Sequence, residues 1–215
     1  MADSTDAGGS IVVSGTGRVI VDPDVADLRL GVAISRPTVA QARSGAAEAM
    51  TAVLAAIGAA GVARRDTRTT LLSVQPRYDY REGQPPALAG YDLANVVDVT
   101  VRDLAALGAV VDGALGAGAT SLDGLTFRLE DPSAAEATAR TAAVAQARSR
   151  AEVLAAAADV AIAGVSDIVE GGPPPAWPMA KAARLTMAAD TATPIEAGLT
   201  EIAVTVTVTF RIARP

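Results

Sequence analysis

The chain contains no cysteine and no histidine. These absences exclude disulfides, thiolate nucleophiles, histidine general bases and zinc sites built from Cys and His. No serine lies in a G-x-S-x-G sequence and Lys181 is the only lysine, so a serine nucleophile lacks a recognisable base. The sequence therefore predicts a protein that is not an enzyme and that has no cofactor and no metal. An enzyme that uses carboxylates alone is the least favoured alternative.

Aromatic residues make up only 3% of the sequence, although half of it is hydrophobic. The core must therefore be built from Ala, Val, Leu and Ile, and alanine-rich helices can lie close to whatever they cover. The net charge is −6, which argues against nucleic acid or an anionic membrane as the main partner, because both require a basic face. A homo-oligomer, or an unknown protein or small-molecule partner, is the expectation that remains.

Long apolar runs are also missing. The longest uncharged stretch, residues 49–63, is shorter than the ~20 residues that a membrane-spanning helix needs, so no transmembrane segment is expected. Residues 1–10 carry acidic side chains and no apolar core, which predicts a disordered leader rather than a signal peptide. These features predict a cytoplasmic location, with a periplasmic or extracellular location as the alternative if a signal has been removed.

Strongly alternating segments are what the chain does have. In residues 199–212, hydrophobic side chains occupy every second position from Ile202 onward, and Thr205, Thr207 and Thr209 fall on the opposite face. Because successive strand side chains point to opposite faces, this pattern predicts a long strand with one apolar and one hydroxyl-rich side. Such a strand needs long partners and helices to cover its apolar side.

Similar patterns predict further strands and three helices. Strands are expected at residues 11–21, 25–35, 67–80, 90–101, 121–130 and 165–170, and helices at 38–60, 103–116 and 131–158. The first two strands are expected to pair as a hairpin across a turn at residues 22–24, and the third and fourth as a second, long-looped hairpin. In the last helix the expected buried stripe is Val144, Ala147, Ala151, Leu154 and Ala158.

One-sided strands of this kind predict an α+β fold, in which helices pack on one face of a mainly antiparallel sheet of long strands. Residues 25–130 follow the ferredoxin-like βαββαβ order, and an additional helix and C-terminal strands follow. No linker divides the chain, so residues 11–213 are expected to form a single domain with a long loop at 171–193.

Several short motifs have a structural explanation. Residues 15–17 (GTG) lack the third glycine of a dinucleotide loop and lie inside a strand, so a bulge or a close backbone contact is expected. Residues 113–118 (GALGAG) lack the Lys and Ser/Thr of a phosphate-binding loop and are interpreted as a helix end. Asp22, Asp24 and Asp27 lack calcium-loop spacing and are interpreted as turn formers.

Two sets of polar side chains are candidates for binding. An arginine cluster near the third strand suits an anion or an acidic partner, although a solvated strand entrance is the simpler explanation; its members are Arg64, Arg65, Arg68, Arg77 and Arg81. The polar strand faces that hold Asp27, Asp98 and Thr205 to Thr209 are expected to form a wet sheet face or an assembly surface, with a ligand site as the alternative.

The long loop at residues 171–193 contains the only tryptophan, Trp177, together with Met179, Leu185 and Met187. Loops longer than ~15 residues are usually functional or disordered. Exposed Trp and Met favour contacts with partners. The loop is therefore expected either to contact a partner or to pack its tryptophan against its own domain.

A series of short motifs runs along the chain in a characteristic order and spacing. They are Ser14–Arg18 (SGTGR), Val21–Ala26 (VDPDVA), Gly61-Val62 followed by Asp66 and Thr69, Pro76 and Tyr78, Gly90-Tyr91, Phe127 before Asp131, and Pro194-Ile195 with Gly198. Over about residues 11–212 the chain resembles the SIMPL-domain family, which includes bacterial periplasmic immunogenic proteins and oxidative-stress-defence proteins.

The resemblance implies an α+β domain, no established catalytic activity, a tendency to assemble into rings or larger oligomers, and a loose association with the envelope or oxidative stress. Two departures stand out: no export signal is visible, and the glycine usual after the long helix is missing around residues 158–160.

The leading functional hypothesis is a non-catalytic, self-assembling SIMPL-domain protein linked to the stress response or the cell envelope. Exposed strand edges and the 171–193 loop would supply its assembly contacts. The alternative is a small-ligand or peptide-binding module that uses the polar sheet face around Thr205, Thr207 and Thr209.

Overall fold

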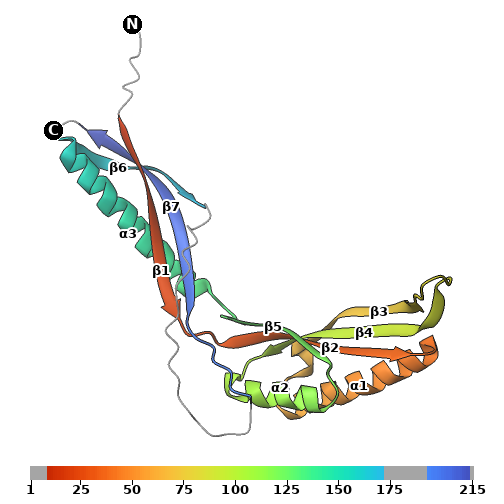
Figure 1. The fold of residues 1–215 in the computed structure, drawn as a ribbon. Coiled ribbons are helices and arrows are strands. Elements are labelled where there is room, and N and C mark those ends of the chain that lie inside the picture. Colours follow the sequence, from red (N-terminus) through yellow and green to blue (C-terminus); the bar gives the residue numbers. More distant parts are fainter. Residues whose placement is uncertain (1–8, 172–192, 214–215) are drawn as a thin grey trace. The chain divides into compact units, whose positions relative to one another are not determined.

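The computed structural model describes residues 9–171 and 193–213, which fall into two compact units. Unit 1 contains the described residues 9–21, 131–171 and 199–213, and unit 2 contains residues 22–130 and 193–198 (Figure 1). The sequence predicts a single domain over residues 11–213, and no change in composition marks the division. None of the helices within the described ranges is long and apolar enough to cross a membrane.

Unit 2 is an antiparallel four-stranded sheet with two helices. Its elements, with the short 3₁₀ turns η1 (Arg64–Asp66) and η2 (Leu104–Ala106), are β2 (Val25–Arg36), α1 (Val39–Ala59), β3 (Thr67–Asp79), β4 (Ala87–Val101), α2 (Leu107–Gly116) and β5 (Ser121–Arg128). The strand order is β3-β4-β2-β5, with every neighbouring pair antiparallel. This arrangement confirms the predicted ferredoxin-like order and the β3–β4 hairpin.

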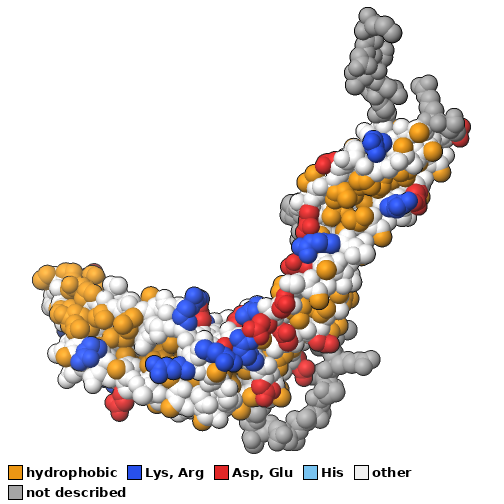
Figure 2. All heavy atoms as spheres, turned by 180° about the vertical axis from the view of Figure 1, so that it is seen from behind, with side chains coloured by type: hydrophobic (Ala, Val, Ile, Leu, Met, Phe, Trp, Pro, Cys, Tyr) orange, Lys and Arg blue, Asp and Glu red, His pale blue; other side chains and the backbone are white. Residues whose placement is uncertain are grey.

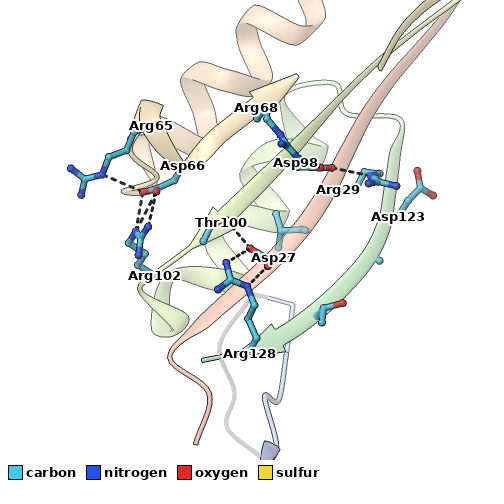
Figure 3. A pocket seen from close by; sticks show the side chains of 13 residues that line it. Asp27, Arg29, Arg65, Asp66, Arg68, Asp98, Thr100, Arg102, Asp123 and Arg128 are labelled. Atoms are coloured by element: carbon cyan, nitrogen blue, oxygen red, sulfur yellow. Dashed lines mark hydrogen bonds and ion pairs between the residues drawn. The ribbon is translucent and has the colours of Figure 1, made fainter. Parts of the chain in front are cut away.

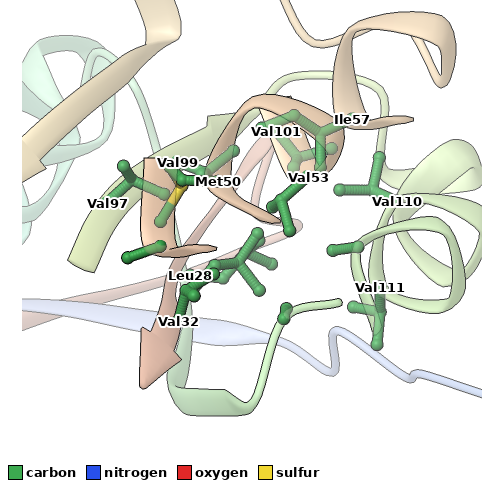
Figure 4. Packing of buried hydrophobic residues seen from close by; sticks show 14 of the residues in the cluster. Leu28, Val32, Met50, Val53, Ile57, Val97, Val99, Val101, Val110 and Val111 are labelled. Carbon is green, nitrogen blue, oxygen red and sulfur yellow. The ribbon is translucent and has the colours of Figure 1, made fainter. Parts of the chain in front are cut away.

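The core of unit 2 lies between one face of this sheet and the two helices. Met50, Val53 and Ile57 of α1 are buried at three- and four-residue spacing, which places them on one side of the helix. They pack against alternate residues of the strands, and Val110 and Val111 of α2 complete the cluster (Figure 4). The opposite face of the sheet is left for polar side chains.

Unit 1 is a three-stranded antiparallel sheet covered by one long helix. Its elements are β1 (Ser10–Val21), α3 (Ser133–Ala157), β6 (Ala161–Glu170) and β7 (Thr200–Ala213), in the sheet order β1-β7-β6. The predicted C-terminal strand is confirmed as β7, and its apolar face is buried against α3 through Val204, Val206, Val208 and Phe210. β1 already begins inside the predicted 1–10 leader, of which residues 1–8 lie outside the described residues.

The prediction that the first two strands form a hairpin is wrong. β1 pairs with β7, whereas β2 pairs with β4 and β5 in the other sheet. The intervening Asp24 does not close a turn between them: its backbone N–H donates to Arg128 O at 3.2 Å, and its Oδ1 accepts the Glu130 N–H at 2.7 Å. Asp24 therefore ties the start of β2 to the end of β5, a contact across more than a hundred residues that local turn patterns do not reveal.

Helix α3 lies very close to β1 because two glycines leave room for it. A Cβ at Gly15 would overlap the Ala143 carbonyl oxygen, and a Cβ at Gly17 would overlap the Ala139 carbonyl oxygen. The expected close backbone contact at residues 15–17 is thus confirmed. Glycine is the residue that permits such an approach of two backbones.

The predicted buried stripe of α3 needs correction. Its buried positions follow a strict four-residue spacing: Ala139, Ala143, Ala147, Ala151 and Ala155. Leu154 is 49% exposed and Ala158 is exposed. Val144 is half-buried against the same cluster. Alanine occupies the positions where α3 lies closest to β1.

Candidate functional site

The open face of the unit 2 sheet carries a depression of about 670 Å³, lined by five arginines and four aspartates among other residues. Strand alternation explains their position. On β2, Ala26, Leu28 and Leu30 point into the core. Asp27 and Arg29 alternate with them and must therefore point to the other face.

Asp98 of β4 is the centre of one ionic group in the depression. Its carboxylate accepts Arg29 Nε at 2.9 Å, Arg68 Nη2 at 3.4 Å and the Thr70 hydroxyl at 3.4 Å. Figure 3 shows Asp98 between the two guanidinium groups. The hydrogen bond from Arg29 lowers the pKa of Asp98 below its usual value, so this carboxylate stays charged at neutral pH.

Asp27 and Asp66 are the centres of the other two ionic groups. Asp27 accepts Arg128 Nε at 2.6 Å and the Thr100 hydroxyl at 2.6 Å, and the Arg128 bond is the main reason that its pKa is lowered. Asp66 accepts Arg102 Nη2 at 3.0 Å. Arg102 also pairs with Glu130, and its pKa is raised by the bonds to Asp66 and Glu130.

Three charged side chains in the depression are less completely paired. Arg65 and Arg68 are each 80% exposed; Arg65 approaches Asp66 only at 3.9 Å, and Arg68 makes the single 3.4 Å bond to Asp98. Asp123 of β5 accepts the Ser121 hydroxyl at 3.0 Å. Guanidinium groups with unused N–H donors are suited to binding oxyanions.

The polar residues predicted to share a face are divided between the two sheets. Asp27 and Asp98 do lie together on the open face of unit 2, where both line the depression and Arg29 bonds Asp98. Thr205, Thr207 and Thr209 lie half-buried on β7 in unit 1, where the Thr205 hydroxyl bonds the Thr16 hydroxyl at 3.1 Å. A ligand or assembly role for this threonine face stays a prediction.

The other sequence candidates have separate outcomes. Of the arginine cluster, Arg65 and Arg68 line the depression, whereas Arg77 and Arg81 approach Asp92 and Asp79 further along the β3–β4 hairpin. Among the predicted turn-forming aspartates, Asp24 binds backbone at the β5 end and Asp27 binds Arg128. The predicted contact residues of the long loop, Trp177, Met179, Leu185 and Met187, lie outside the described residues.

Sequence reasoning missed several residues of the depression, among them the two arginines Arg102 and Arg128. Arg128 bonds an aspartate 101 positions away, and Arg102 bonds one 36 positions away. Nothing local distinguishes either arginine from an ordinary solvated charge. The only available signal was the ferredoxin-like strand order, which brings β2, β4 and β5 into one sheet.

Proteins with similar sequences are found in several bacteria. A 26 kDa periplasmic immunogenic protein of Brucella melitensis is 36% identical over 210 residues, covering 94% of this chain and 84% of that protein, and its Brucella abortus counterpart matches equally. YggE of Escherichia coli K12, an uncharacterized protein, is 33% identical over 154 residues, covering 72% of this chain and 62% of YggE.

These relatives contradict the cytoplasmic location predicted from the sequence. Both Brucella proteins are named as periplasmic proteins, and the similarity to them extends over nearly the whole chain. The acidic, weakly apolar composition of residues 1–10 was therefore a poor guide to location.

The family model described as SIMPL, protein of unknown function (DUF541), matches residues 11–210, a span that takes in both units. This is the span over which the motifs of the sequence resemble that family. The chain therefore belongs to the SIMPL family.

Proposed function

We propose that this protein is a non-catalytic, self-assembling protein of the bacterial periplasm with a role in the cell envelope or the stress response. The observation that carries the proposal is the free edge of β3 in unit 2. The periplasmic names of the Brucella relatives support the location. The stress or envelope role rests on the properties that the resemblance to the SIMPL family implies.

β3 is a 13-residue strand at one edge of the unit 2 sheet. Within the described ranges, no side chain hydrogen bonds to its backbone. An edge strand of this length presents a row of backbone donors and acceptors to which another chain can add. β3 is therefore suited to pair with a second copy.

The side chains around β3 are unusually apolar for a surface. Leu72 is 68% exposed and Val74 is 39% exposed, because α1 packs on β2 and β4 rather than on β3. Leu71, Tyr78, Tyr80 and Leu88 of the same hairpin are also exposed. Figure 2 shows hydrophobic side chains gathered at one end of unit 2. An exposed apolar patch beside a free edge favours association between copies.

Side chains hydrogen bond to the backbone along the edge of β1 in unit 1, whereas none bonds to the β3 backbone among the described residues. The outward Thr16 N–H donates to Gln146 Oε1 at 2.7 Å, and Arg150 Nη1 donates to Ser14 O at 2.7 Å. Both side chains come from α3, so they occupy the central part of this edge. The contrast supports β3, rather than β1, as the assembly edge.

The charged groups of unit 2 support the absence of catalysis. General acid–base catalysis needs a group with a pKa near the working pH. The pKa values of Asp27 and Asp98 are lowered by their arginine partners, which moves them away from neutrality. A lowered pKa suits these two carboxylates to charge pairs and makes them weak proton acceptors at neutral pH.

Light scattering coupled to size exclusion tests the proposal. The wild-type chain is expected to elute as an oligomer, and a Leu72→Lys/Val74→Lys double variant as a monomer, because charged side chains on an edge oppose strand addition. Both positions are exposed, so the double variant is expected to keep its fold, which circular dichroism checks.

A matched control is Val153→Lys on α3, where the native side chain is 67% exposed. This variant adds a lysine at an equally exposed apolar position in the other unit and should remain an oligomer. A wild-type monomer at high concentration, or an unchanged oligomer in the double variant, would contradict assembly through β3.

A further inference from the structure

We propose that the depression on the open face of unit 2 binds a small multivalent oxyanion, such as a polycarboxylate or a phosphate ester. Arg65 and Arg68 are the residues that bind it through their guanidinium groups. This proposal does not depend on assembly through β3. Arg68 belongs to β3, but it lines the depression on the sheet face. The core of unit 2 lies on the other side of the sheet, so the charged side chains of this face are not needed to fill the core.

The lining of the depression holds five arginines and four aspartates, and two of the arginines lack a full ion-pair partner. Asp98 is bonded by Arg29, Asp27 by Arg128, and Asp66 by Arg102, so one arginine is already assigned to each of these carboxylates. Arg65 and Arg68 each have only one weak contact to an aspartate, and the fourth aspartate, Asp123, bonds Ser121. The remaining N–H groups of Arg65 and Arg68 face solvent and are available to a ligand.

One of these two arginines, Arg68, is also held near the guanidinium group of Arg29. Asp98 contacts both Arg68 and Arg29, and it therefore keeps these two side chains close together (Figure 3). Arg29 uses its Nε for this bond, and no bond to its two terminal nitrogens is found among the described residues. Bidentate guanidinium groups match the geometry of carboxylate and phosphate oxygens.

The rest of the depression defines the class of ligand. Its volume of about 670 Å³ lies within the range of small-molecule sites. Thr100 and Thr126 contribute hydroxyl groups to the lining, and Leu28 is the only large apolar residue in it. A polar ligand with oxyanion groups fits this lining, and an apolar ligand does not.

Asp123 limits the size of the anion. It lies on β5, at the opposite edge of the sheet from β3. The pKa of Arg29 is raised mainly by its hydrogen bond to Asp98, and the negative charge of Asp123 adds a smaller contribution. A long polyanion that crossed the whole sheet face would meet this carboxylate, whereas a compact anion beside β3 would not. Repulsion from Asp123 therefore favours a small ligand over nucleic acid.

Isothermal titration calorimetry of the full chain tests the site, with citrate and inorganic pyrophosphate as probes at constant ionic strength. We expect at least one probe to bind. In an Arg65→Gln/Arg68→Gln variant the affinity should fall about tenfold or more, because two charge-assisted contacts are lost. Asp123→Asn should raise the affinity by about two- to fivefold, because a repulsive charge is removed.

Arg43→Gln on α1 is the matched control, since Arg43 is exposed in the same unit but does not line the depression. Its affinity should equal that of the wild type. Binding of citrate alone assigns the site to carboxylates, and binding of pyrophosphate alone assigns it to phosphates. The proposal is overturned if neither probe binds at about 5 mM, or if the Arg65/Arg68 variant and the Arg43 control bind equally. The gain expected for Asp123→Asn remains informative even if the double variant is poorly folded.

Discussion

The two units solve the same packing problem by different means. Each covers one face of an antiparallel sheet with helix, but unit 2 fills the space with Val, Leu, Ile and Met side chains, whereas half of the buried cluster of unit 1 is alanine. In unit 1 the helix is so close to β1 that residues 15 and 17 have no room for a side chain. The helix–sheet interface of unit 2 therefore depends on large apolar side chains. The interface of unit 1 depends on the absence of side chains at residues 15 and 17.

The largest loss of stability is expected when a large side chain is removed from the core of unit 2. Leu30 on the central strand β2 is fully buried, and Leu30→Ala should lower the stability of unit 2 by about 2–5 kcal/mol because it leaves a cavity. Hydrogen exchange measured peptide by peptide reports this as faster exchange in β2 and β4. Equal acceleration in β7 would mean that the two units do not unfold separately and would weaken the comparison.

The second-largest loss of stability is expected in unit 1, at a β1 glycine that leaves no room for a side chain. Gly17→Ala adds one methyl group against the Ala139 carbonyl, and it should lower the stability of unit 1 by about 1–3 kcal/mol through overpacking. Hydrogen exchange should accelerate in β1, β7 and α3.

Gly58→Ala in α1 is the matched control, because a Cβ there meets nothing within 4 Å. Alanine is the better helix former, so this variant should stabilise unit 2 by about 0.5–1 kcal/mol. If Gly17→Ala is as harmless as Gly58→Ala, the close approach of α3 to β1 does not control the stability of unit 1.

The smallest effect concerns the charged face of unit 2. The side chains of Arg128 and Asp27 are 43% and 39% exposed, so solvent screening limits their pair to about 1 kcal/mol or less. The pKa of Asp27 is lowered from 3.8, which means that the folded state holds fewer protons than the unfolded state. The stabilisation is therefore present above about pH 4 and is lost as the pH falls below it.

Asp27→Asn tests this dependence. Urea unfolding should find the variant less stable than the wild type at pH 7, and the difference should shrink toward pH 3. A difference that persists unchanged at pH 3 would show that the carboxylate acts through shape or hydrogen bonding rather than through its charge.

Much of the fold was predictable because it follows from local periodicity. Alternating side chains located β7, and helical spacing together with the Thr38 cap located α1, whose N-terminal N–H at Gln41 is indeed bonded by the Thr38 hydroxyl. The ferredoxin-like order of unit 2 followed from the sequence of elements. The prediction that β1 pairs with β2 was wrong, because the short, turn-like connection between them joins strands of two different sheets.

The candidate site was predictable only in part. Asp27 and Asp98 were expected on polar strand faces, and strand alternation alone justified that expectation. Their partners were not predictable, because Arg128 reaches Asp27 only after β5 has paired with β2. Arg65 and Arg68 were noted as part of a basic cluster, but their lack of a full ion-pair partner is seen only in the completed sheet.

The sequence by itself determined which faces are apolar, where helices begin, and that no cysteine or histidine chemistry is available, because each of these depends on residue type and short-range spacing. Tertiary structure decided which strands pair, which alanines of α3 lie closest to β1, and which arginines are left without a full partner. These properties depend on contacts between residues far apart in the chain, and their energy is defined only once both partners are in place.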